Sequence, residues 1–181
     1  MFNEDRNSPQ FSWQDLGDIA KGRPNLGQQV PVLVYRLFQY TLRDVLIAEF
    51  GVEKANEIIV QAGRQAGRQF CENMLDRNVG FNEFVARLQQ VLKEQAIGIL
   101  RVEQADLDEM HFVLTVAEDL DCSGLPSTNE VVCQYDEGFI AGIFEAYTGK
   151  PFLAREVDCW ALGGRVCRFD VGLEQEEKEI A

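Results

Sequence analysis

The cysteines of this sequence gather toward one end of the chain, and this constrains its fold more than any other feature. There are five, an odd number, and four of them follow residue 120. In a reducing compartment such a cluster indicates a metal site more often than a framework of disulfides. The C-terminal part of the chain must therefore fold so that several thiols can meet. The five are Cys71, Cys122, Cys133, Cys159 and Cys167.

Two of these cysteines lie on opposite arms of a predicted β-hairpin. The ranges 152–160 and 165–171 are typical of strands, and a Leu-Gly-Gly turn separates them. Pairing of the two strands would bring Cys159 and Cys167 close together. Two thiolates can therefore converge near the turn of this hairpin.

Two further donors lie within reach of the hairpin. Glu156 precedes Cys159 by three residues, and Cys133 opens a predicted helix over 133–147, where the helix dipole favours a thiolate. Three sulfurs and one carboxylate suit a closed tetrahedral zinc site. The spacing also leaves open buried free cysteines, or a disulfide between Cys159 and Cys167. Cys122, in a loop before the helix, is an alternative ligand.

The remainder of the chain predicts an α+β fold, with N-terminal helices packed on an antiparallel sheet. Apolar residues recur at helical spacing over 28–50, 53–75 and 81–95, and the period then changes to that of strands over 97–102 and 111–117. The helices come first, and two antiparallel pairs of strands flank the fourth helix. Glycine pairs four residues apart in two of the helices would allow close helix packing. These are Gly63 with Gly67, and Gly138 with Gly142.

Composition and pattern predict one domain with two tails. Residues 1–27 are expected to form an irregular arm, 28–173 the domain, and 174–181 an acidic tail. At 46% hydrophobic residues the chain can bury a sizeable core. No apolar run of about 18 residues is present, which argues against a membrane-spanning helix. The start of the sequence lacks the pattern of a signal peptide, so we expect a cytoplasmic protein.

Charge and motif content exclude several classes of function. The net charge is −13, with 30 acidic and 17 basic residues, which argues against binding to nucleic acid or to an anionic membrane surface. His111 is the single histidine, so a nucleophilic triad has few possible members, and no P-loop or dinucleotide fingerprint is present. We therefore expect a binding protein and not an enzyme.

The last third of the sequence resembles the 4-vinyl reductase domain family. The resemblance rests on Cys133, on the Gly-x-x-x-Gly helix, on the Glu-x-x-Cys of Glu156 and Cys159, and on a Gly-x-x-x-Cys-x-Phe segment ending at Phe169. It is close over about 40 residues and extends more weakly from about residue 30 to 172. The same superfamily includes subunits of the TRAPP vesicle-tethering complex.

The resemblance implies a metal, a ligand and a partner. Members that sense aromatic compounds bind zinc through three Cys and one Glu, which correspond here to Cys133, Glu156, Cys159 and Cys167. Family members commonly dimerise through their helices. The sensors act through an attached ATPase and a DNA-binding domain. The sequence ends soon after the domain, so we expect a homodimer or a separate effector protein to carry any output.

The sensors hold a small apolar ligand in a pocket beside the zinc site. A count without gaps places Phe84 and Phe112 where phenol-sensing relatives have His and Trp, which predicts a more apolar pocket for a hydrophobic or aromatic ligand. The full set of residues expected to line the pocket is Phe84, Phe112, Phe139, Phe144, Tyr147 and Trp160. Two other functions stay open: an accessory role in tetrapyrrole metabolism, of the vinyl-reduction kind, and a TRAPP-like protein-interaction module.

Overall fold

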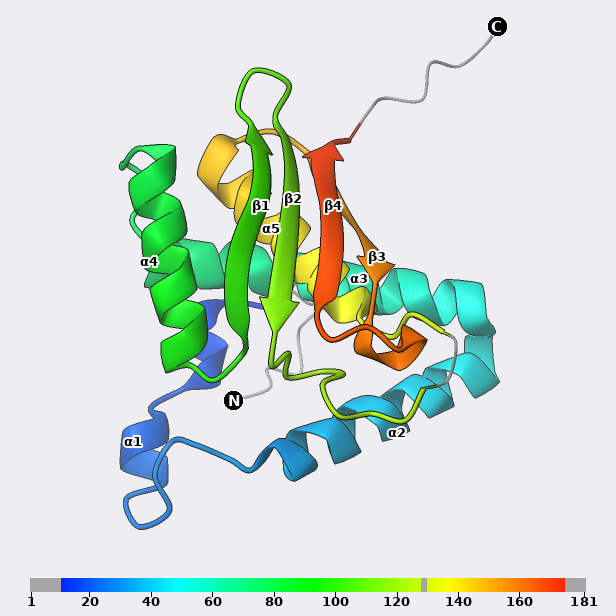
Figure 1. The fold of residues 1–181 in the computed structure, drawn as a ribbon. Coiled ribbons are helices and arrows are strands. Elements are labelled where there is room, and N and C mark those ends of the chain that lie inside the picture. Colours follow the sequence, from blue (N-terminus) through cyan, green and yellow to red (C-terminus); the bar gives the residue numbers. More distant parts are fainter. Residues whose placement is uncertain (1–10, 128–129, 175–181) are drawn as a thin grey trace, which may run out of the picture.

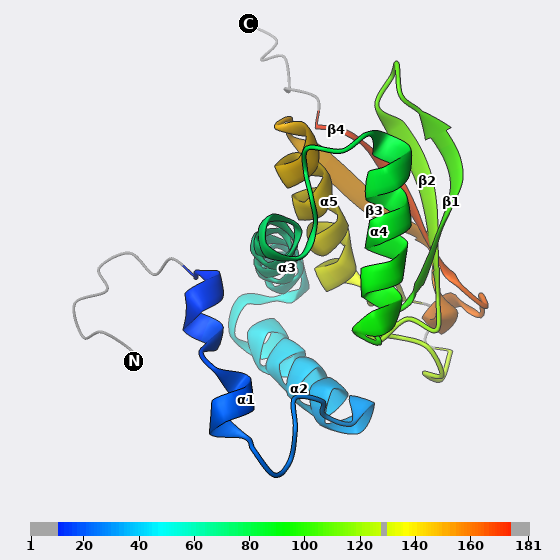
Figure 2. The same cartoon turned by 90° about the vertical axis from the view of Figure 1, so that its left-hand side faces the viewer.

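A four-stranded antiparallel sheet forms one side of the molecule. The computed structural model describes residues 11–127 and 130–174, and over these ranges the strands follow the order β1-β2-β4-β3. All the larger helices lie on one face of this sheet (Figures 1 and 2). The strands are β1 (Ile99–Asp106), β2 (His111–Ala117), β3 (Phe152–Asp158) and β4 (Cys167–Leu173).

The helices form successive layers behind the sheet. Figure 2 shows α4 and α5 next to the sheet, α3 behind α5, and α2 on the outside of α3. The longer helices are α2 (Val32–Phe50), α3 (Val52–Met74), α4 (Phe81–Glu94) and α5 (Gln134–Thr148). Three short helical turns complete the structure: η1 (Trp13–Leu16), α1 (Ile19–Gly22) and η2 (Trp160–Leu162). Helix α5 is therefore enclosed between α3 and the sheet.

Glycines bring α3 and α5 into close contact. A Cβ atom at any one of four glycines would overlap a main-chain carbonyl oxygen of the facing helix, so only hydrogen fits there. The four are Gly63 and Gly67 on α3, and Gly138 and Gly142 on α5. Glu145 of α5 closes the same crossing, because its carboxylate lies 3.0 Å from Arg64 Nη1 and 2.6 Å from Arg68 Nη2. The close packing expected from the glycine spacing is therefore confirmed.

The core lies between the sheet and the helices next to it. Alternate residues of the strands face the helices and are buried, while their neighbours face outward. These inward-facing positions include Phe112, Leu114, Val116, Phe152, Ala154, Phe169 and Val171. Phe84, Leu88, Val91 and Leu92 of α4 and Ile140, Ile143 and Phe144 of α5 cover them.

The α+β fold predicted from the sequence is confirmed, with two corrections. The two predicted strand pairs are joined into one sheet, because β2 also pairs with β4. Strand β1 continues to Asp106, since a bulge between Val102 and Gln104 restores its pairing with β2. The predicted arm contains η1 and α1, and its first ten residues lie outside the described residues, as does the acidic tail beyond residue 174. Within the described ranges, each helix is too short or too polar to cross a membrane.

Candidate metal centre and ligand cavity

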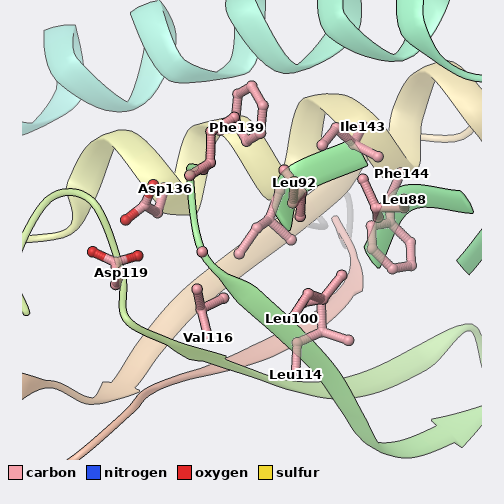
Figure 3. Close-up of a pocket in the computed structure, with 13 residues that line it drawn as sticks. Leu88, Leu92, Leu100, Leu114, Val116, Asp119, Asp136, Phe139, Ile143 and Phe144 are labelled. Atoms are coloured by element: carbon pink, nitrogen blue, oxygen red, sulfur yellow. The ribbon is translucent and has the colours of Figure 1, made fainter. Parts of the chain in front are cut away.

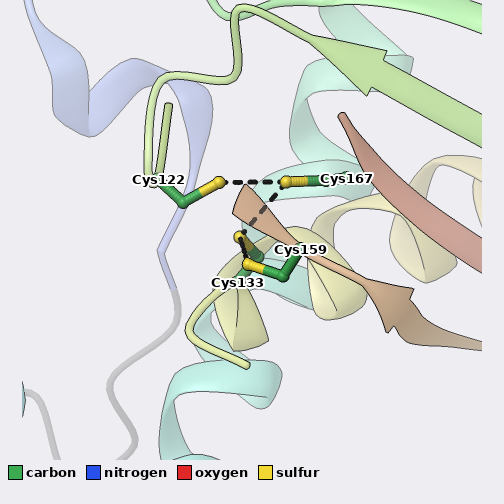
Figure 4. Close-up of side chains that lie close together, drawn as sticks. All are labelled: Cys122, Cys133, Cys159 and Cys167. Atoms are coloured by element: carbon green, nitrogen blue, oxygen red, sulfur yellow. Dashed lines mark hydrogen bonds between the residues drawn. The ribbon is translucent and has the colours of Figure 1, made fainter. Parts of the chain in front are cut away.

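Four cysteine side chains from separate segments meet beside the start of α5 (Figure 4). Cys122 comes from the loop after β2, Cys133 directly precedes α5, Cys159 follows β3 and Cys167 begins β4. All four are buried free thiols, and their sulfur atoms lie within 4.8 Å of one another. Cys133 Sγ is 3.9 Å from Cys159 Sγ and 3.8 Å from Cys167 Sγ, and Cys122 Sγ is 3.0 Å from Cys167 Sγ.

These separations fit a tetrahedral metal ion. Zinc bonded to sulfur at about 2.3 Å places neighbouring sulfurs of a tetrahedron about 3.8 Å apart. The distances from Cys133 Sγ to the sulfurs of Cys159 and Cys167 match this value. The shorter contact between Cys122 and Cys167 is a thiol–thiol hydrogen bond, which deprotonation on metal binding would replace. The four cysteines could therefore hold a metal ion.

Local backbone geometry delivers the two hairpin sulfurs to the centre. After Cys159 the chain makes a tight turn in which the N–H of Gly164 donates to the Cys159 carbonyl at 3.0 Å. Gly163 adopts φ +95°, in the left-handed region that favours glycine. Strand pairing then sets Cys167 opposite Val116 of β2, facing the helices. The Gly-Gly turn predicted from the sequence is thus the element that closes this side of the site.

The carboxyl group of Glu156 borders the cluster. Its Oε2 accepts a hydrogen bond from the N–H of Cys133 at 3.3 Å, whereas its Oε1 is buried and has no hydrogen-bond partner among the described residues. Burial is the main cause that raises the pKa of Glu156 to about 8. An unpartnered buried oxygen next to several thiols is a group that a bound cation would stabilise.

Acidic groups are concentrated around the sulfurs. Burial raises the pKa of Asp121 to about 6 and, with its charged neighbours, raises the pKa of Asp136 well above the usual range. Hydrogen bonds from the other three thiols lower the pKa of Cys159, so its sulfur is favoured as a thiolate. A divalent cation would offset the cost of burying these groups in their charged forms.

An apolar cavity of about 30 Å³ lies between α4, α5 and the sheet (Figure 3). Its apolar lining comes from Leu88, Leu92, Ile97, Gly98, Leu100, Leu114, Val116, Phe139, Ile140, Ile143 and Phe144. Two carboxyl groups, Asp119 and Asp136, lie at one end of it. Donor atoms of these two side chains lie within 4.8 Å of each other and of the Cys133 sulfur. The polar end of the cavity therefore adjoins the cysteine cluster.

Asp119 connects the cavity to the turn that carries Cys122. Its Oδ1 accepts hydrogen bonds from the N–H groups of Asp121 at 2.9 Å and Cys122 at 3.0 Å. Asp119 is almost fully buried, so these bonds are shielded from water. Across the cavity end, Asp136 Oδ2 is buried without a hydrogen-bond partner among the described residues.

Helix α2 holds the same turn from the other side through polar side chains. Tyr35 donates to Asp121 Oδ1 at 2.8 Å and Gln39 donates to Oδ2 at 2.6 Å. Arg36 Nε donates to the carbonyl of Leu120 at 2.8 Å. We call these residues and their neighbours the inner face of α2: Tyr35, Arg36, Gln39, Tyr40 and Arg43. The inner face fixes the Cys122 turn against the rest of the molecule.

Comparison with known proteins identifies the part of the chain that contains this centre. Residues 112–173, from β2 to the end of β4, match the family model of the 4-vinyl reductase domain. The matched range includes all four clustered cysteines. The chain carries a 4-vinyl reductase domain. The resemblance read from the sequence is thereby confirmed.

Relatives and solved structures agree with this assignment. The uncharacterized protein MJ0150 of Methanocaldococcus jannaschii is 28% identical over 166 residues, which cover 90% of this chain and 89% of that protein. A vinyl-4-reductase family protein of the same organism has a similar fold, with TM-score 0.60 and 17% identity over 93% of this chain and 100% of that one.

Two further solved structures share the fold. One is the phenol-responsive sensory domain of the transcription activator PoxR with phenol, with TM-score 0.63 and 17% identity over 83% of this chain and 79% of that one. The other is trafficking protein particle complex subunit 3 from Naegleria fowleri, covalently bound to palmitic acid, with TM-score 0.64 and 13% identity over 82% of this chain and 98% of that one. At these identities the likeness concerns the fold.

The residues that the sequence predicted for the pocket fall into three places in the 4-vinyl reductase domain and the helices packed on it. Phe139 and Phe144 line the cavity. Phe84, Phe112 and Tyr147 lie beyond it in an aromatic cluster, where Phe84 stacks on Tyr147 at 3.9 Å and Phe112 lies 4.9 Å from Phe144 between ring centroids. The remaining residue does not line this cavity: Trp160 is on η2, where its indole N–H donates to the Leu125 carbonyl at 3.0 Å.

The predicted metal ligands Cys133, Cys159 and Cys167 lie together, with Glu156 at their edge. Cys122, which the sequence left as an alternative, joins them. Its position depends on the turn after β2, which no spacing rule describes. Asp119 and Asp136 were not singled out, because single carboxylates in an acidic chain carry no motif.

The two residues whose roles the sequence left open lie away from the cluster. Cys71 is fully buried in the hydrophobic core, and burial raises the pKa of its thiol to about 11. His111 lies on the exposed side of β2, where its Nε2 is 2.6 Å from Asp170 Oδ1.

Proposed function

We propose that this 4-vinyl reductase domain is a zinc-containing sensor or regulatory domain that binds a small hydrophobic ligand in the cavity between α4, α5 and the sheet. The observation that carries the proposal is the contact between the two sites. The polar end of an otherwise apolar cavity adjoins Cys133, one of the four clustered cysteines. A ligand in the cavity and a metal at the sulfurs would therefore act on the same end of α5.

In this proposal the zinc ion is structural. Cys133, Cys159 and Cys167 hold it, and the resemblance to the aromatic-compound sensors gives Glu156 as the fourth ligand. The ion would join the start of α5 to the C-terminal hairpin, two segments that are distant in sequence. Because such a site forms only in the folded chain, metal binding contributes directly to the free energy of folding.

The ligand class follows from the lining of the cavity. Apart from two carboxyl groups, the lining is aliphatic or aromatic, which favours a hydrophobic ligand of the aromatic kind. Support comes from the PoxR sensory domain, whose structure contains phenol. The free volume of about 30 Å³ has room for one or two water molecules, so a ligand must displace α4 or the α5 side chains. That displacement would be the signal, provided that the ligand binds the two arrangements with different affinity.

We further propose a homodimer that forms through helix α2. Opposite its polar inner face, α2 exposes a stripe of apolar side chains that we call the outer face. Its members are Leu33, Val34, Leu37, Phe38, Leu42 and Val45. Contiguous apolar surface of this kind marks interaction sites on soluble proteins. The dimer, or a separate effector bound at α2, would receive the signal, because the inner face of the same helix holds the Cys122 turn.

A cavity-filling variant tests ligand binding separately from metal binding. Binding of phenol and toluene to purified protein is measured by calorimetry, with zinc content per chain determined by mass spectrometry. We expect about one zinc per chain and saturable binding of at least one probe. Leu92→Phe should abolish probe binding and leave the zinc content unchanged, because Leu92 lines the cavity and lies outside the cysteine cluster. Leu107→Phe, at an exposed leucine in the β1–β2 turn, is the matched control.

Two results would contradict this function. Absence of metal from the reduced, folded protein would remove the zinc centre. Probe binding that survives Leu92→Phe would place the ligand elsewhere.

A protein-interaction module is the second candidate. The observation that favours it is the exposed outer face of α2, together with a fold shared with a trafficking protein particle complex subunit. A stable heteromeric complex, combined with no saturable binding of small probes, would support this alternative. The tetrapyrrole role fits less well, since such a ligand needs a pocket on the order of several hundred Å³.

A further inference from the structure

We propose that Cys122 supplies the fourth sulfur of the metal centre, and that Glu156 lies beside the ion without coordinating it. The site of this chain is then a four-thiolate site for zinc or another thiophilic divalent ion. The inference rests on the metal centre of the proposed function and changes the identity of one of its ligands.

The positions of the sulfur atoms favour this ligand set. The donor atoms that lie within 4.8 Å of one another here are the sulfurs of Cys122, Cys133, Cys159 and Cys167. All four cysteines are at most 1% exposed. The Sγ of Cys122 approaches that of Cys167 to 3.0 Å, closer than any other pair for which a contact is formed in the cluster. A metal ion bound by the other three sulfurs would therefore have Cys122 within reach.

The chemistry of the donors points the same way. A carboxylate and a thiolate each contribute one negative charge, so a site with three Cys and one Glu and a site with four Cys have the same formal charge. Charge therefore does not separate them. Zinc accepts both, but thiolate is the softer donor, and structural zinc sites are most often built from cysteine and histidine.

Glu156 already has other contacts. Its Oε2 accepts the N–H of Cys133 at 3.3 Å, and its own N–H donates to Glu137 Oε1 at 2.8 Å. A carboxylate that receives the N–H of a ligating residue holds that residue in position, as groups behind a metal's ligands commonly do. Glu156 therefore has a role at this centre without a bond to the ion.

The turn that carries Cys122 is built to hold the side chain in place. Asp119 accepts its N–H at 3.0 Å, and the Asp121 carboxylate is held by Tyr35 and Gln39 of α2. Tyr40 adds a hydrogen bond to the Asp121 carbonyl at 3.0 Å. Loop residues are normally exposed, yet this cysteine is completely buried. Fixation from two sides, together with burial, distinguishes Cys122 from an incidental loop cysteine.

Cobalt substitution tests the ligand set. Co²⁺ replaces zinc in tetrahedral thiolate sites, and the intensity of its sulfur-to-metal charge-transfer band rises with the number of thiolates. Purified protein is stripped of metal, titrated with Co²⁺ and compared with Cys122→Ser and Glu156→Gln. We expect Cys122→Ser to lose about one quarter of the band, since it removes one of four thiolates. Glu156→Gln should keep the full band. Cys71→Ser, at a buried cysteine outside the cluster, is the matched control and should also keep it.

X-ray absorption at the zinc edge of the unaltered protein gives a second measurement that does not depend on a variant's folding. Four sulfur neighbours support the inference. Three sulfurs and one oxygen, with a full cobalt band in Cys122→Ser, would overturn it and leave the zinc centre of the proposed function intact. Failure of every variant and of the unaltered protein to bind either metal would overturn both.

Discussion

Helices α2 and α5 are both rich in apolar residues, yet the structure uses them in opposite ways. Eight of the fifteen residues of α5 are buried, because α3 covers one side and the sheet covers the other. None of the nineteen residues of α2, which the structure describes in full, is buried. Its polar inner face contacts the molecule, and its apolar outer face is turned to solvent.

The comparison shows that apolarity alone does not place a helix in the core. Helix α5 can be enclosed because Gly138 and Gly142 let α3 approach its backbone. Helix α2 has no such glycines, and its inward contacts are hydrogen bonds to the turn around Cys122. We infer that α5 stabilises the monomer, whereas the apolar face of α2 serves an interaction with another chain.

The largest expected effect comes from one substitution made in both helices. Phe144 of α5 is 3% exposed and packs against Phe112 and Phe152, whereas Phe38 of α2 is 68% exposed. Phe144→Ala should lower the free energy of unfolding by about 3–5 kcal/mol, through lost burial and the cavity left behind. Phe38→Ala should change it by less than about 0.5 kcal/mol. Urea unfolding at a protein concentration where the chain is monomeric measures both.

Equal losses in these two variants would contradict the comparison, because they would mean that α2 contributes its apolar face to the monomer core. The unaltered slope of the urea transition serves as the control that both variants unfold from the same compact state.

The next effect concerns the crossing that encloses α5. A Cβ at position 138 would overlap the carbonyl oxygen of Val60, a main-chain atom that can move only with its helix. Gly138→Ala should therefore cost about 3 kcal/mol, although alanine is the better helix former. Gly80→Ala is the matched control, since a Cβ there meets nothing within 4 Å and the backbone angle suits any residue. Thermal unfolding compares the two, and a stable Gly138→Ala variant would show that α3 and α5 are less tightly packed.

These two helices also show what the sequence could predict. The periodicity of apolar residues predicted both helices within a few residues of their ends, and the glycine spacing predicted the close crossing. Periodicity could not show which side of α2 faces inward, because its polar residues contact a loop and not an apolar surface. For the same reason the spacing of the hairpin found Cys159 and Cys167, while the position of Cys122 depends on hydrogen bonds between α2 and the turn.

A charge on the outer face of α2 tests the interaction directly. Leu37 is 64% exposed at the centre of that face. Leu37→Glu should weaken self-association about 100-fold, since a dimer would bury the carboxylate among apolar side chains. Light scattering coupled to size-exclusion chromatography measures the mass. Leu107→Glu, at an exposed leucine away from α2, should leave the mass unchanged, and an equal response of both variants would remove the outer face as the interface.

The smallest effect sharpens the role of the inner face. Tyr35→Phe removes the hydrogen bond to Asp121 and should lower the free energy of unfolding by about 1.5 kcal/mol. Tyr147→Phe is the matched control, because it also loses one hydrogen bond, from its hydroxyl to the Val79 carbonyl. Amide hydrogen exchange separates the two. Only Tyr35→Phe should speed exchange over residues 119–123, because only that bond fixes the turn to α2. Equal protection of the turn in both variants would mean that Asp119 holds Cys122 in place without α2, and that a metal-bound turn has no connection to the outer face.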